Sequence, residues 1–175
     1  MSDILDKVLA DRNPLEKLLA YVPGFKGYYE RQDRRDADKL LRETLATRIE
    51  KIWQRVSAIQ RELVSSGGLQ YVDDLEAAAI KLRTFADRVR NATYGYAGVF
   101  DAVNVNTEEL NLIYAYDLAM FEYVDSMNQA VDHIEQSMGS DGLPATIRNL
   151  TTIAQEAIDT FNLRVETILK TAPAE

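Results

Sequence analysis

Residues 110–138, LNLIYAYDLAMFEYVDSMNQAVDHIEQSM, decide the fold of this chain. Apolar side chains recur there in steps of three and four residues, a spacing that predicts a helix buried along one whole side. These seam positions are Leu110, Ile113, Asp117, Met120, Val124, Met127, Val131, Ile134 and Met138. One of them, Asp117, is a carboxylate, and a carboxylate buried without a partner is strongly unfavourable.

A second segment repeats this spacing and supplies the partner. Its seam positions are Leu143, Ile147, Leu150, Ala154, Ala157, Phe161, Arg164 and Ile168. If the two helices pack antiparallel about the turn Gly-Ser-Asp-Gly at 139–142, Arg164 lies opposite Asp117. The sequence therefore predicts a buried polar pair, Asp117 with Arg164. Such a pair either fixes the register of the helices or forms a polar site for an ion or a small ligand; we favour the first role.

The preceding part of the chain predicts another helical hairpin, over residues 30–93. Its first helix ends at Gly67 and Gly68, since glycine readily adopts the backbone angles that end a helix. The connector 94–106 breaks the helical pattern, and Thr107 begins the second hairpin, 107–171. We therefore expect an all-α fold, an antiparallel up-down-up-down four-helix bundle with coiled-coil-like seams.

Residues 1–29 predict short helices packed at one end of this bundle. Asn13-Pro14-Leu15-Glu16 has the pattern of a capping box, with asparagine as the cap and glutamate three residues later. The helix that it begins should end near Tyr21, because Val22-Pro23-Gly24-Phe25 is typical of a type II turn. At 175 residues, the chain is expected to form a single domain.

Composition excludes several classes of function. The net charge is −8, and such an acidic surface repels phosphate backbones, so no nucleic-acid partner is expected. The absence of cysteine excludes disulfides and thiolate nucleophiles. No apolar stretch suffices to span a bilayer and no secretory signal is evident, so we expect a cytoplasmic protein.

The sequence also lacks the residues of familiar catalytic centres. His133 is the only histidine, and Ala130 stands where a ferritin-like diiron helix would carry glutamate. A Ser-His-Asp triad has no supporting pattern either. We therefore predict no catalytic residue, no metal site, no cofactor and no enzymatic activity, with His133 exposed or partly packed.

Two further groups of residues are candidate surfaces. A basic set consists of Arg31, Arg35, Lys39 and Arg42, which are spaced to share one helix face, with Arg34 beside them. It suits phosphate, acidic lipid or an acidic protein, but interleaved aspartates favour pairing within the molecule. An aromatic set from two loops at the same end of the bundle consists of Phe25, Tyr28, Tyr94, Tyr96 and Phe100. It suits either a plug over that end, which we favour, or a recognition surface.

Several segments resemble those of a group of bacterial helical proteins of uncharacterised activity. They are PGFKGY at 23–28, RRDADKLLR at 34–42, GGLQY at 67–71 and YGYAG at 94–98. The likeness covers roughly residues 20–125. It implies a bacterial, cytoplasmic origin and brings no activity, cofactor or binding residue.

These observations predict a non-enzymatic scaffold or protein-interaction module with a protein partner or self-association. Two alternatives stay open: a bundle that binds a small ligand or ion at the Asp117 layer, and a peripheral membrane protein that uses its N-terminal helix and basic face.

Overall fold

The computed structural model describes residues 3–92, 100 and 107–170. In these residues every regular element is a helix and no strand occurs. The α-helices are α1 (Asp3–Leu9), α2 (Pro14–Tyr21), α3 (Arg34–Ser66), α4 (Val72–Asn91), α6 (Thr107–Gln136) and α7 (Leu143–Lys170). The predicted all-α class is confirmed for this part of the chain.

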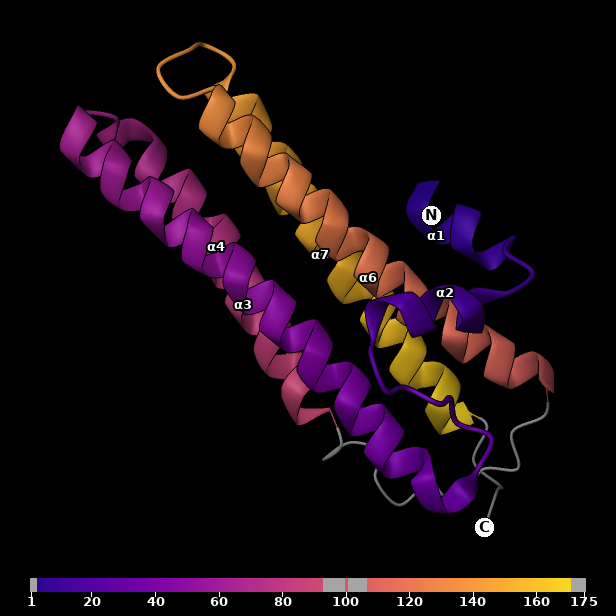
Figure 1. The fold of residues 1–175 in the computed structure, drawn as a ribbon. Helices are drawn as coiled ribbons and strands as arrows, with labels where there is room; N and C mark the ends of the chain where they lie inside the picture. The colour runs from indigo at the N-terminus through magenta and orange to yellow at the C-terminus, as the bar shows by residue number, and fades with distance from the viewer. Residues whose placement is uncertain (1–2, 93–99, 101–106, 171–175) are drawn as a thin grey trace.

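The four long helices form two hairpins that lie side by side (Figure 1). One consists of α3 and α4, and the other of α6 and α7. The hairpins meet through contacts of α3 with α6 and of α4 with α7. Because α3 and α6 run toward the same end of the molecule (Figure 1), these contacts join parallel helices, whereas each hairpin joins antiparallel ones.

The helix ends follow the expected signals closely. Gly67 has the left-handed backbone angle φ of +88°, and the N–H groups of Gly67 and Gly68 both donate to the carbonyl of Leu63. A glycine in this conformation satisfies carbonyls that the last turn of a helix leaves without partners. The predicted end of α3 at the two glycines is therefore confirmed, and α6 begins at Thr107 as predicted.

The predicted capping box before α2 is wrong in its chemistry. Helix α2 does begin at Pro14 and end at Tyr21, but the side chain of Asn13 makes no capping hydrogen bond. Instead, the Asn13 N–H donates to the carboxylate of Asp11 at 3.0 Å. The Asp11 carboxylate therefore stabilises the turn between α1 and α2. Aspartate often forms such hydrogen bonds with backbone N–H groups close to it in sequence.

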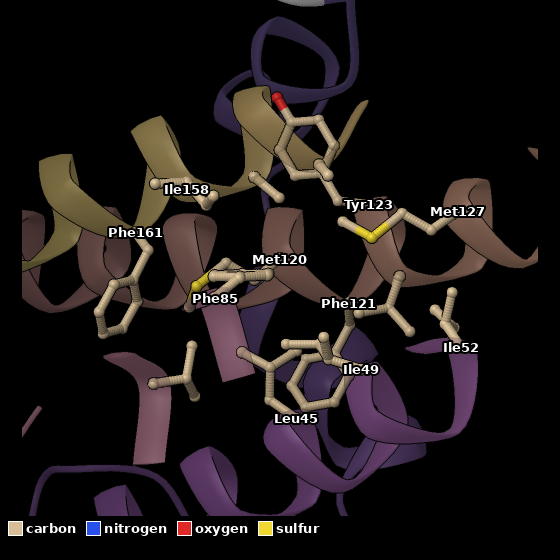
Figure 2. Packing of buried hydrophobic residues seen from close by; sticks show 14 of the residues in the cluster. Leu45, Ile49, Ile52, Phe85, Met120, Phe121, Tyr123, Met127, Ile158 and Phe161 are labelled. Carbon is tan, nitrogen blue, oxygen red and sulfur yellow. The ribbon is translucent and has the colours of Figure 1, made fainter. Parts of the chain in front are cut away.

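The core is a hydrophobic cluster to which all six of these α-helices contribute. Figure 2 shows its middle, where Leu45, Ile49 and Ile52 of α3 face the side chains of α6, with α7 beyond. The rings of Phe85 and Phe161 meet edge to face at 6.2 Å and join α4 to α7. Close packing of this kind supplies most of the stability of long helices.

Helices α1 and α2 lie along the side of α6, rather than across the end of the molecule as the sequence suggested. Leu5, Val8 and Leu18 are buried there. This explains why the first half of α6 is apolar around most of its circumference: α7, α3 and the two short helices each cover part of it.

Arg48 of α3 fastens α2 to this position. Its guanidinium lies 5.4 Å from the ring centroids of both Tyr21 and Phe121, which stack on each other. Its Nη2 donates to the Tyr21 carbonyl at 2.9 Å, and the Tyr21 hydroxyl donates to Asp125 at 2.7 Å. One cation therefore connects α3, α2 and α6.

We expect Arg48→Ala to lower the free energy of unfolding by about 1–2 kcal/mol, because it removes a hydrogen bond and two cation–π contacts. Urea denaturation measures the change. Lys51→Ala, at an exposed position one turn along the same helix, is the control and should stay within about 0.5 kcal/mol of the wild type. Equal effects of the two substitutions would contradict the role of Arg48.

Candidate functional site: a buried polar network

The structure brings Asp117 and Arg164 together. Arg164 Nε donates to Asp117 Oδ1 at 2.5 Å, and both side chains are 0% exposed. The seams of α6 and α7 therefore meet in the register that places their two polar positions opposite each other.

The pair belongs to a longer chain of charges that the sequence analysis missed. Arg164 Nη2 also donates to Asp38 Oδ1 at 2.7 Å, and Arg42 Nε donates to Asp38 Oδ2 at 2.8 Å. Charges of opposite sign therefore alternate from Asp117 through Arg164 and Asp38 to Arg42. Two carboxylates and two guanidiniums balance, as buried ions require.

A usable signal for Asp38 was present in the sequence. Asp38 lies three residues before Leu41 and seven before Leu45, so it continues the buried seam of α3 toward its beginning. Its charge suggested only one of the interleaved aspartates that pair with the basic set, whereas its spacing indicates a buried position. Helical periodicity was the better guide here.

Tyr28 closes the network from the N-terminal loop. Its hydroxyl donates to Asp117 Oδ2 at 2.7 Å and accepts from Arg164 Nη2 at 3.2 Å. Its N–H donates to the Tyr114 hydroxyl at 2.7 Å, and the two rings stack at 5.2 Å. Arg34 Nε donates to the Tyr28 carbonyl at 2.7 Å. The network therefore holds the loop between α2 and α3 against α6 and α7.

Two residues of the predicted basic face are in fact buried. Arg34 donates from Nη1 to the carbonyl of Phe100 at 2.9 Å. Arg42 donates from Nη1 to the carbonyls of Val89 and Arg90, where the last turn of α4 leaves acceptors without helical partners. A continuous basic face is therefore wrong; Arg31, Arg35 and Lys39 are its exposed members.

The aromatic set is likewise internal where the structure describes it. Phe25, Tyr28 and Phe100 are all buried, and Tyr28 meets both other rings edge to face at 5.2 Å. Of the two proposed roles, a recognition surface is wrong for these three residues, and their burial fits a plug. Tyr94 and Tyr96 lie outside the described residues.

Burial shifts the pKa values of the network. It raises the pKa of the Asp117 carboxyl, an effect that Arg164 opposes. It raises the pKa of Tyr28 well above its usual value, and the neighbouring carboxylate of Asp117 adds to this. It also raises the pKa of Tyr114 to about 12. Each shift has the direction expected when a charged form loses water.

These tyrosines should make the fold sensitive to alkali. Since the pKa of folded Tyr114 is raised from 10.0 to about 12, the unfolded chain loses this proton first, and stability falls as pH rises through that interval. Tyr28 adds to the effect in the same direction. We expect ultraviolet titration to show tyrosinates forming late and together with loss of helical circular dichroism.

The Tyr114→Phe variant is the control for this titration. It should lower the amplitude of the late step, because it removes one of the protected phenols. Ionisation of all tyrosines near pH 10 in a chain that stays helical would contradict the buried placement of these groups.

The carboxylates of the network are bonded to side chains of the same protein. Asp38 and Asp117 have four carboxylate oxygens, and each accepts a hydrogen bond from the chain's own arginines or tyrosine. Among the described residues no group of three or more histidine, aspartate or glutamate side chains is arranged to hold a metal ion. His133 is exposed on α6. The arrangement can therefore fix the relative positions of helices.

Comparison with known proteins adds no relative. No protein-family model, curated protein or solved structure matches this chain. Within the described ranges, no helix is both long and apolar enough to cross a lipid bilayer.

Proposed function

We propose that this protein is a non-enzymatic helical scaffold or protein-interaction module that acts through its surface. The observation that supports this most is that side chains of the protein itself bond to every carboxylate oxygen of Asp38 and Asp117. A general acid or base must reach its substrate, and a carboxylate that binds a cation must have oxygens to offer. In Asp38 and Asp117 those oxygens are already bonded within the chain.

The scaffold itself is proposed to be a four-helix bundle of α3, α4, α6 and α7, in which successive long helices run in opposite directions. Contacts of α3 with α4 and α6, and of α7 with α4 and α6, support this arrangement. Its three longest helices have 28 to 33 residues, so the bundle is about 45 Å long, which suits a protein that presents separate surfaces at its two ends.

The two alternatives have less support. A ligand at the Asp117 layer would have to displace Tyr28 or Arg164 from the carboxylate. Membrane association would use a basic face, of which Arg34 and Arg42 are buried, and an apolar face of α1, of which Leu5 and Val8 pack inside the molecule.

The test combines partner capture with native mass spectrometry. The tagged chain, cross-linked in its native host, is expected to capture a protein partner or a second copy. The Tyr28→Phe variant alters the interior and leaves the surface unchanged, so it should capture the same partner. Native mass spectrometry of the purified chain should show the mass of the polypeptide alone or of its oligomer.

Two results would overturn the proposal. One is the absence of both partner and self-association. The other is a stoichiometric small molecule that is present in the wild type and lost in Asp117→Asn, which would assign the network to ligand binding.

A further inference from the structure

A groove of about 390 Å³ opens between the turns of the two hairpins, at the end of the molecule opposite the buried polar network. Tyr71 lines it from the first hairpin and Met138 from the second, both partly buried. The buried Leu63 and Leu143 lie in its wall, and Ser66, Gln70 and Ser140 are polar members of the lining. Its volume lies at the lower end of the range for ligand sites, about 300–1,000 Å³. It therefore has room for a few apolar side chains and not for an entire helix.

Two apolar side chains beside the groove are exposed. Leu69 is 64% exposed and Val64 is 55% exposed, and each is adjacent in sequence to a residue that lines the groove. Tyr71 and Met138 are only partly buried. Exposed apolar side chains next to a depression are one mark of an interaction site.

Carboxylates also line the groove from both hairpins. Glu62 lines the groove from the first hairpin and Asp141 from the second, and no lysine or arginine is among the described residues that line it. The two turns, residues 61–74 and 137–143, carry one basic and four acidic residues, a net charge of −3. The potential at this end is therefore negative, which favours a cationic partner.

We propose that this groove binds a cationic amphipathic helix of another protein, whose apolar side chains enter the groove while its lysines or arginines face Glu62 and Asp141. This inference rests on the proposed function and names the site and the partner class for it. Apolar anchors at helical spacing are the usual way a helix docks in a groove. A second copy of this same acidic end fits less well, because like charges would meet.

The probe is a labelled synthetic peptide of about four helical turns, with leucines along one face and lysines elsewhere. We expect fluorescence anisotropy to show saturable binding that weakens as salt is added. The double variant Glu62→Lys with Asp141→Lys should bind the peptide at least about tenfold more weakly. The variant Met138→Gln, which removes an apolar wall, should also weaken binding.

The control has the same change in net charge at a distance. Glu16→Lys with Asp87→Lys alters two exposed acids of α2 and α4, and should change the affinity less than about twofold because the charges lie far from the groove. A peptide with glutamate in place of lysine should not bind.

Three results would overturn the inference. The groove variant and the control could bind the peptide equally, or the acidic peptide could bind as well as the basic one. The chain alone could also sediment as a dimer that the groove variant alters, which would assign the groove to a second copy.

The inference and the proposed function can fail separately. If a partner is captured in the native host but the peptide does not compete with it and the groove variant captures it equally, only this inference fails. If the wild type captures no partner and does not self-associate, the proposed function fails whatever the peptide does.

Discussion

Replacing Asp38 by alanine is expected to lower the free energy of unfolding by about 3–5 kcal/mol, the usual effect of removing one member of a buried ion pair. The loss is large because Asp38 accepts from both Arg42 and Arg164. Both guanidiniums stay buried when the carboxylate is removed, and Arg164 then balances only Asp117. Urea denaturation, with the slope of the transition compared between variants, measures the change.

Asp36→Ala is the matched control, since Asp36 is exposed on the same helix two residues earlier. It should change stability by less than about 0.5 kcal/mol. Equal stabilities of the two variants would show that the buried charges do not depend on Asp38. The free energy of unfolding of Asp38→Asn should lie between those of Asp38→Ala and Asp36→Ala, because the amide keeps one acceptor oxygen.

Replacing Gly27 by alanine is expected to cost about 2–5 kcal/mol, from two causes that add. Gly27 has a φ of +85°, where an L-residue is strained by about 1–2 kcal/mol. A Cβ there would also lie 2.6 Å from the Tyr114 hydroxyl oxygen, and relieving such overpacking costs about 1–3 kcal/mol. Moving that hydroxyl would break its bond with the Tyr28 N–H.

Gly139→Ala separates the two causes. Gly139 has a φ of +76°, and a Cβ there would meet nothing within 4 Å. It should therefore cost only the backbone strain, about 1–2 kcal/mol. Thermal or urea unfolding of both variants gives the difference, which reports the clash with Tyr114. Equal losses would mean that the loop moves away from Tyr114 without cost.

Helical periodicity predicted much of the fold because each long helix has a seam of residues that is buried along its length. Each of the seams of α6 and α7 has one charged residue, and antiparallel pairing of the two seams predicted that these residues meet. The structure shows this contact between Asp117 and Arg164. The two glycines predicted the end of α3, and Thr107 predicted the beginning of α6, because helix ends depend on local backbone chemistry.

The parts that were missed depend on contacts between segments distant in sequence. Tyr28 enters the network from a loop 89 residues before Asp117, and no local pattern reveals which interior group a loop tyrosine reaches. The placement of α1 and α2 along α6 is likewise a tertiary property. Its only trace in the sequence is that the first half of α6 is apolar on nearly every side.

The position of the polar network along the molecule has a consequence for how the structure opens. Asp38, Asp117, Arg164 and the last carbonyls of α4 all lie near one end, where they join every long helix and the N-terminal loop. The hairpin turns are at the other end, where residues 64–67 and 139–142 are exposed. Local unfolding costs least where few buried contacts must break. Amide hydrogens should therefore exchange fastest near the turns and slowest around the network, so that the hairpins separate from the end where the groove lies.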